Sequence, residues 1–248
     1  MVTGATGRTG SLLFLALQSA GIEARAFVRN ITKAREVLGC KACDESEGIY
    51  VGDITDPETL GNALRGVRRL VILTSSYPLQ LPNGTYYFPP GEYPKDIDWI
   101  GSNNQVRTAL MAGSVEHILL VSSMGTTQPD TFLDKLGDGH ALFYKLNGEI
   151  DLMASGIPSY TIIKPGGLLS TEGGRSLLLA GHNDRLMHAR VTRADVASVL
   201  LAAILNPKHS RNLRFDLSSD PDQPAGSLLS LFEDARDWSG SWNNNVQL

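Results

Sequence analysis

Short apolar runs alternate along the chain with longer segments in which apolar residues recur at helical spacing. The runs are rich in Val, Ile, Leu and Phe and are bounded by glycine, asparagine or charged residues, a pattern typical of buried strands. The pattern predicts strands at 1–3, 23–29, 48–52, 69–74, 117–122, 159–164 and 213–217, and helices at 8–20, 31–38, 95–112, 140–154, 191–204 and 225–237, with one more beginning at 56–58. This alternation predicts an α/β fold, a doubly wound parallel sheet covered by helices on both faces.

Three helix ends carry sequence signals of their own. Gly21 stands where a glycine can end the first helix. The run Asp56-Pro57-Glu58 offers a capping side chain, a proline for the first turn and an acid near the positive end of the helix. Thr192 and Asp195 form a variant of the capping box, with Asp in place of Glu.

The segment 75–94 does not fit the alternation. It holds five prolines and five aromatic residues, and long connections in compact domains are usually functional. We expect it to cover a substrate, together with parts of 168–190 and 218–240. No repeat, low-complexity tract or linker divides the chain, so residues 1–248 are predicted to form one domain.

Composition limits the classes of function. The 248 residues are 42% hydrophobic and carry a formal net charge of −4, so neither nucleic acid nor an anionic membrane surface is an expected partner. The longest apolar runs are too short to span a bilayer. Two cysteines can form only one disulfide, which could not stabilise a secreted chain of this size. The cysteine count therefore favours a reducing compartment. Cys40 and Cys43 have redox spacing, but the acids around them disfavour a functional dithiol, and no histidine has the spacing to complete a metal site.

The strongest chemical signal is the run Thr3-Gly4-Ala5-Thr6-Gly7-Arg8-Thr9-Gly10, between the first predicted strand and the first predicted helix. Glycines there permit a tight turn and let backbone amides approach a pyrophosphate, and the helix N-terminus supplies N–H donors and partial positive charge. No Gly-Lys-Ser/Thr follows, so a loop for nucleoside triphosphates is not expected. The alternative is a glycine-rich turn that binds no ligand. The position of the run at the first strand–helix turn disfavours this alternative.

The end of the second strand bears on which dinucleotide binds. An acid there would select NAD through the adenosine ribose, but the chain has Phe27-Val28-Arg29-Asn30. Arg29 can bind a 2′-phosphate, and Arg8 can stack on the adenine or add a second charge. We therefore expect NADP(H).

Polar residues also close the third and fourth strands. Asp53 could accept a hydrogen bond from the adenine amine, or equally could begin an Asx turn. Thr74 and Ser75 end the fourth strand, at the switch point where nucleotide crevices form.

Together these motifs resemble the atypical short-chain dehydrogenase/reductases, an NAD(P)-binding group that includes NmrA-like proteins. The segments that carry the resemblance are the glycine run, 52–56, 71–75, 121–125 and 164–168, and those similar to a plant and algal subgroup of NADP-binding proteins are 93–105, 134–137 and 191–197. The resemblance covers roughly residues 1–236. It implies a Rossmann fold with a small C-terminal substrate lobe and NADP(H) as cofactor. From the reducing compartment that the cysteine count favours, we expect a cytoplasmic or plastid stromal location.

The resemblance also implies which residues bind the cofactor. Lys145 matches a helix lysine that hydrogen-bonds the nicotinamide ribose, and Arg29 would hold the 2′-phosphate. The remaining positions are Gly4, Thr6, Gly7, Arg8, Thr9 and Gly10 around the pyrophosphate, Asp53 and Ile54 beside the adenine, Thr74 and Ser75 at the middle of the cofactor, and Pro165, Gly166 and Gly167 at the nicotinamide.

Typical members pair a tyrosine with a lysine four residues later on one helix face. If Lys145 is that lysine, Ala141 occupies the tyrosine position and the dyad is absent. The pair Tyr160 and Lys164 has the spacing but lies in a predicted strand, where four residues span about 13 Å. We interpret that match as chance.

Other side chains could replace the missing tyrosine. Ser123, after the fifth strand, could donate to a substrate carbonyl or equally satisfy local backbone. Tyr144 and His140 lie near Lys145 in sequence, although a packed aromatic and a solvated loop histidine are the favoured interpretations. We therefore take Ser123 and Lys145 as the catalytic candidates.

Two functions follow from the sequence. The first is an NADPH-dependent reductase of a small carbonyl, enone or quinone-type substrate, acting as a monomer or homodimer. The alternative is a non-catalytic NADP-binding regulatory or assembly factor, which the missing tyrosine favours. The acidic balance disfavours RNA binding, and an epimerase or dehydratase would normally keep the tyrosine.

The glycine turn begins unusually early. Only Met1, Val2 and Thr3 precede it, whereas a central strand has about five residues. We therefore expect a longer form of the chain, with the rest of this strand and a targeting signal ahead of it.

Overall fold

The computed structural model describes residues 1–128, 131–185 and 190–237. Its strands are β1 (Val2–Thr3), β2 (Ala26–Val28), β3 (Ile49–Val51), β4 (Arg69–Ile72), β5 (Leu79–Gln80), β6 (Tyr86–Tyr87), β7 (His117–Val121), β8 (Tyr160–Pro165), β9 (Gly167–Leu169), β10 (Leu177–Gly181), β11 (Arg190–Thr192) and β12 (Leu213–Asp220). Its α-helices are α1 (Gly10–Ser19), α2 (Ile31–Leu38), α3 (Pro57–Leu64), α4 (Ser102–Ala112), α5 (Phe132–Lys135), α6 (Ala141–Ala154), α7 (Arg193–Leu205), α8 (Pro207–Ser210) and α9 (Leu228–Arg236). A π-helix spans Lys95–Gly101, and short 3₁₀ helices lie at Glu45–Glu47 and Leu136–Asp138.

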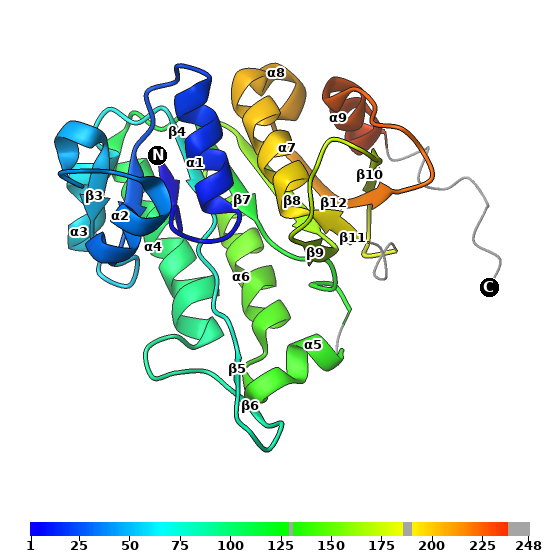
Figure 1. The fold of residues 1–248 in the computed structure, drawn as a ribbon, viewed down its shortest axis with the longest axis horizontal. Helices are drawn as coiled ribbons and strands as arrows, with labels where there is room; N and C mark the ends of the chain where they lie inside the picture. The colour runs from blue at the N-terminus through cyan, green and yellow to red at the C-terminus, as the bar shows by residue number, and fades with distance from the viewer. Residues whose placement is uncertain (129–130, 186–189, 238–248) are drawn as a thin grey trace.

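Eight strands form the central sheet, in the order β10-β12-β8-β7-β4-β1-β2-β3 (Figure 1). Every neighbouring pair is parallel except β10 and β12, which are antiparallel. The strand order reverses at β1, which pairs with β2 on one side and β4 on the other. The predicted doubly wound α/β sheet is confirmed, and its switch point lies between β1 and β4.

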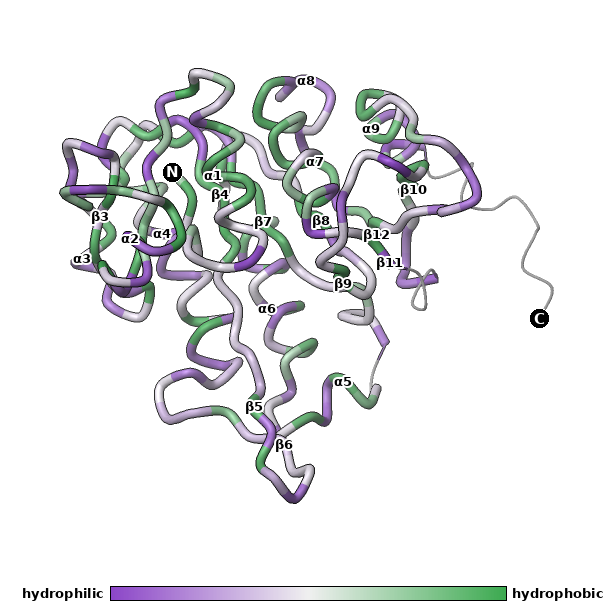
Figure 2. The backbone as a smooth tube through the Cα atoms, viewed as in Figure 1, coloured by the Kyte–Doolittle hydropathy of each residue, from purple (hydrophilic) through white to green (hydrophobic). Residues whose placement is uncertain are grey.

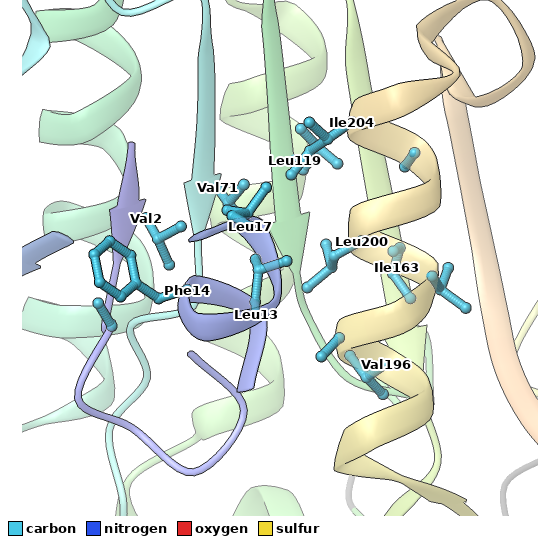
Figure 3. Packing of buried hydrophobic residues seen from close by; sticks show 14 of the residues in the cluster. Val2, Leu13, Phe14, Leu17, Val71, Leu119, Ile163, Val196, Leu200 and Ile204 are labelled. Atoms are coloured by element: carbon cyan, nitrogen blue, oxygen red, sulfur yellow. The ribbon is translucent and has the colours of Figure 1, made fainter. Parts of the chain in front are cut away.

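Alternate residues of each strand supply two apolar layers, one on each face of the sheet. Val71 belongs to the layer shared with α1 and α7, whereas Leu70 and Ile72 belong to the layer shared with α3 and α4. Figure 3 shows side chains of α1 and α7, such as Leu13 and Leu200, beside residues of the central strands. Figure 2 shows that hydrophobic residues are frequent in the central strands and in α1 and α7.

The predicted helix ends are found where the sequence places them. Gly21, with φ of +69°, follows the last residue of α1 and its cap. The Asp56 side chain accepts from the backbone N–H of Glu58 at the start of α3. Thr192 accepts from the backbone N–H of Asp195 at 2.9 Å and opens α7.

Several short elements were not predicted. The segment 75–94 contains the two-residue strands β5 and β6, the segment 168–190 contains β10, and β9 begins just before it at Gly167. Strands of two to five residues are too short to give a clear periodic signal, which explains why the alternation misses them. The helix expected over 95–112 divides into the π-helix and α4. Parts of the predicted substrate-covering segments, 186–189 and 238–240, lie outside the described residues.

Cys40 and Cys43 form a disulfide, whereas the sequence favours two reduced thiols. The backbone brings them together because Cys43 has φ of +56° and donates its N–H to the Glu47 carboxylate at 2.7 Å.

No helix in the described part of the chain is long and apolar enough to cross a membrane.

A buried histidine makes the fold sensitive to acid. His117 is 2% exposed and its Nε2 lies 2.8 Å from the hydroxyl of Thr161. Burial, with a smaller contribution from the charge of Arg69, lowers the pKa of His117 from 6.5 to about 4. The unfolded chain therefore binds a proton between these pH values that the folded chain does not, so stability is lost as pH falls from 6.5 to 4.

As pH falls across this interval, we expect protonation of His117 in the unfolded chain to lower the free energy of unfolding by roughly 3 kcal/mol. Each unit of difference in pKa between the folded and unfolded chain is worth about 1.4 kcal/mol. Urea unfolding at pH 7 and pH 4, compared between the wild type and His117→Gln, measures the contribution. The variant should lose much less stability than the wild type over the same pH interval. Equal losses in the two proteins would contradict the assignment.

Candidate functional site

The glycine turn joins β1 to α1, and other backbone atoms lie very close to two of its glycines. Gly4 has φ of +67°, and a Cβ on it would lie 2.7 Å from the carbonyl oxygen of Leu73. A Cβ on Gly10 would lie 2.1 Å from the Gly4 carbonyl oxygen. Larger residues are therefore excluded at both positions. At the start of α1, Thr9 makes no side-chain cap and the first turn holds no acid, an N-terminus suited to an anion.

A cavity of about 550 Å³ opens in front of this turn. Its walls come from the glycine turn and from the residues that follow β2, β3 and β4, the place where open parallel sheets bind ligands. The structure brings together at this cavity eight of the predicted cofactor residues: Gly4, Thr6, Gly7, Arg29, Asp53, Ile54, Thr74 and Ser75.

The wall after β2 is more highly charged than the sequence indicates. Arg29 lines the cavity together with Lys33 of α2, which the sequence analysis did not single out. The guanidinium of Arg29 lies 3.1 Å from Glu92 and 4.0 Å from Asp53. Asp53 also accepts from the N–H and the hydroxyl of Thr55, at 2.9 and 2.8 Å. It therefore forms the Asx turn that the sequence left open.

Arg8 lies outside the lining of this cavity. Its guanidinium carbon is 5.5 Å from the ring centre of Tyr77, a cation–π contact with the segment that follows β4.

Lys145 of α6 lies outside the lining of this cavity but contacts Ser75, which lines it. Its ammonium donates to the hydroxyl of Ser75 at 2.9 Å and to Asp98 Oδ1 at 2.6 Å. The other oxygen of Asp98 accepts from the backbone N–H of Ser76 at 3.1 Å and from its hydroxyl. Asp98 is 6% exposed. A buried carboxylate thus fixes both the lysine and the chain that follows β4.

Asp98 is another site residue that could not be singled out from the sequence. It lies in the π-helix, a local irregularity often found at functional sites. The π-helix packs so closely on α6 that a Cβ at Gly148 would lie 2.7 Å from the Asp98 carbonyl oxygen. The available signal was its place in the segment 93–105, which carries the resemblance but points to no role for any one residue.

A buried amide ties the ends of β1 and β4 together. Gln105 of α4 accepts from the Thr3 hydroxyl at 2.6 Å and donates to Thr74 Oγ1 at 3.2 Å. Because Gln105 is fully buried, it sets the hydroxyl of Thr74 relative to the glycine turn.

The residues expected beside the nicotinamide lie further along the sheet. The hydroxyl of Ser123 donates to the Met124 carbonyl at 2.9 Å, the local contact that was the alternative to catalysis. Pro165 ends β8, and its carbonyl accepts from the N–H of Met124 at 3.0 Å. Gly166 donates its N–H to the Leu217 carbonyl at 3.0 Å, so this amide is already engaged.

At the start of α6, both candidate neighbours of Lys145 have local structural partners. His140 has φ of +48° and its Nδ1 lies 3.2 Å from Asp134. The ring of Tyr144 stacks on Trp99 with the ring centres 5.9 Å apart. Both observations agree with the favoured structural interpretations, and Ala141 begins the helix at the tyrosine position.

Buried charges hold the segment after β7. Glu149, fully buried one turn beyond Lys145, accepts from the Ser122 hydroxyl and from Arg214 Nε, the latter at 2.7 Å.

Lys164 is fully buried in β8 and pairs with Asp184 and Asp216. The spacing of Tyr160 and Lys164 is therefore a strand coincidence, and Lys164 has a structural partner of its own.

Comparison with known proteins identifies the nucleotide-binding part of the chain. The model of a family described as NAD(P)H-binding matches residues 4–207. Sanguinarine reductase of Eschscholzia californica is 36% identical over 252 residues, covering 90% of this chain and 89% of that protein. An uncharacterised chloroplastic protein of Arabidopsis thaliana is 37% identical over 94% of this chain and 74% of its own length. The photosystem II assembly factor Ycf39 of Trieres chinensis is 25% identical over 94% of this chain and 67% of that protein.

Solved structures show the same fold. An oxidoreductase of Lactococcus lactis superposes with a TM-score of 0.70 at 20% identity, over 94% of this chain and 95% of that one. A triphenylmethane reductase of Citrobacter, solved with NADP(H), has a TM-score of 0.53 at 21% identity, over 88% and 70% of the two chains. With the glycine turn, the strand order and the family match together, the chain belongs to the NAD(P)H-binding Rossmann family, among the atypical short-chain dehydrogenase/reductases.

Proposed function

We propose that this protein is an NADPH-dependent reductase of a small organic carbonyl, enone or quinone-type substrate. The observation that carries the proposal is the position of Lys145, which pairs with Asp98 and donates to Ser75, a residue that lines the cavity in front of the glycine turn. Functional groups of active sites are held in place by such partners. The 36% identity to sanguinarine reductase supports a reductase over the other chemistries of the fold.

The residues present fit NADPH. The glycine turn admits a pyrophosphate, and Arg29 and Lys33 offer two cations at the wall where a 2′-phosphate would lie. Bound NADPH supplies a hydride. The chain's own residues then have two tasks, which are to orient the cofactor through Thr74, Ser75 and Lys145 and to hold a proton donor near the substrate.

Lys145 is the proposed proton-bearing group of this site. Its ammonium has two fixed acceptors in Asp98 and Ser75, so it can support a proton transfer through the Ser75 hydroxyl or stabilise negative charge on the substrate oxygen. Ser123 is a second candidate donor, since a rotation about one bond would release its hydroxyl from the Met124 carbonyl.

An absorbance assay of NADPH oxidation tests the reductase proposal. The purified protein is offered quinones, enones, small aldehydes and flavins, with heat-treated protein as the control. We expect turnover with at least one class of acceptor. Tight binding of NADPH without turnover of any acceptor would contradict the reductase proposal.

A non-catalytic NADP-binding role is the second candidate, because Ala141 stands where the tyrosine of the dyad would be. The name of the relative Ycf39 is that of an assembly factor. In such a role, partner capture from plastid extract would survive the double variant Lys145→Ala with Ser123→Ala but fail in Arg29→Glu. A reductase would lose turnover in the first of these variants while still binding NADPH.

A further inference from the structure

Arg29 lies between two carboxylates that come from different parts of the chain. Glu92 accepts from its guanidinium at 3.1 Å, and Asp53 lies at 4.0 Å. Asp53 is already occupied by the N–H and hydroxyl of Thr55. Glu92 is therefore the acid that most directly pairs with Arg29.

The pairing balances the charge of the cavity wall. Arg29 and Lys33 contribute two positive charges, and Asp53 and Glu92 contribute two negative charges. A 2′-phosphate carries negative charge and needs a free planar donor, so it competes with Glu92 for Arg29. The 2′-hydroxyl of NAD has the opposite requirement, because it donates to a carboxylate.

Glu92 belongs to the long segment after β4 rather than to the strand ends that form the nucleotide site. Within 77–94, it is the residue that lines the cavity. The Arg29–Glu92 pair is exposed, with 55% and 40% of the side chains accessible. Exposed pairs of this kind are weak and are readily exchanged for a better partner.

We propose that Glu92 is a specificity-determining residue, which occupies Arg29 until the 2′-phosphate of NADP(H) displaces it. This inference rests on the proposed function for its ligand class. Glu92 thereby reduces the advantage that Arg29 gives to NADP(H) over NAD(H). It also links recognition of the 2′-phosphate to release of the segment that follows β4.

Calorimetric titration with NADPH and with NADH tests the proposal on the whole chain. Glu92→Gln should tighten NADPH binding about fivefold, the upper range for an exposed ion pair, and should change NADH binding less than about twofold. In an Arg29→Gln background the same change at Glu92 should lose its effect on NADPH. That non-additivity would identify Arg29 as the group through which Glu92 acts.

Glu116→Gln is the matched control, because Glu116 forms an equally short exposed pair with Arg68 at 3.1 Å and does not line the cavity. It should leave both affinities unchanged. Unchanged or weaker NADPH binding by Glu92→Gln, or equal tightening of both nucleotides, would overturn the proposal. If the wild type bound neither nucleotide, both this inference and the proposed function would fall, whereas binding without turnover would count against the reductase alone.

Discussion

Replacing Lys145 by methionine is expected to lower kcat of the NADPH-dependent reaction by about 100-fold or more, the usual contribution of a positioned proton-transfer group. Methionine keeps the length and apolar stem of the side chain but removes the ammonium that donates to Ser75 and Asp98. The cofactor cavity is lined by other residues, so the dissociation constant of NADPH should rise by much less than kcat falls. Steady-state kinetics with the best acceptor, together with an NADPH titration, separate the two effects.

Asp98 acts in this scheme through Lys145 rather than on the substrate. Asp98→Asn keeps an oxygen for the N–H of Ser76 but weakens the charge-assisted bond to the ammonium. We therefore expect a smaller loss in kcat than for Lys145→Met, about tenfold. The double variant should be no slower than Lys145→Met alone, because the two residues work as one unit.

Lys208→Met provides the control for loss of a lysine. Lys208 lies on α8, is exposed, and is not among the residues that line the cavity. Full activity in Lys145→Met with normal activity in the control would exclude Lys145 from the chemistry. It would leave Ser123 as the remaining candidate proton donor.

The fold follows from the sequence because its signals are local and repeated. The alternation of apolar runs with helical segments requires parallel strands with crossover helices, and Gly21, Asp56 and Thr192 mark helix ends by chemistry confined to a few residues. Elements such as β5 and β6 carry no such signal. Their pairing depends on the path of a long connection, which no local pattern specifies.

The candidate site divides in the same way. The glycine turn could be predicted because the requirement for a small residue at Gly4 and Gly10 is visible in the sequence. Asp98 and Glu92 could not, because each becomes meaningful only when the fold carries it to Lys145 or Arg29, 47 and 63 residues away. One carboxylate among the many acidic residues of the chain gives no sign of such a partner.

The partners of Lys164 in the core could not be predicted either, because a lysine within an apolar strand pattern does not indicate which residues it contacts. Its side chain is fully buried and pairs with Asp184 and, at 3.2 Å, with Asp216. Burial and the neighbouring Asp184 raise the pKa of Asp216, although Lys164 opposes this. Burial alone would raise the pKa of Asp184 as well, but hydrogen bonds from Lys164 and Thr127 lower it. The lysine is therefore the group that allows two carboxylates to share one buried site.

Removing this cation should cost more than removing either anion. Lys164→Met leaves two buried carboxylates without a counter-charge, and we expect it to lower the free energy of unfolding by about 3–5 kcal/mol. Asp216→Asn leaves a one-to-one pair of Lys164 with Asp184, and its amide oxygen can still accept from the N–H of Asp184, a bond of 2.7 Å in the wild type. Its cost should be less than about half as large. Urea unfolding of both variants at neutral pH measures the two losses in free energy of unfolding. If Asp216→Asn proved the more damaging change, the lysine would not be the residue that holds the buried cluster together.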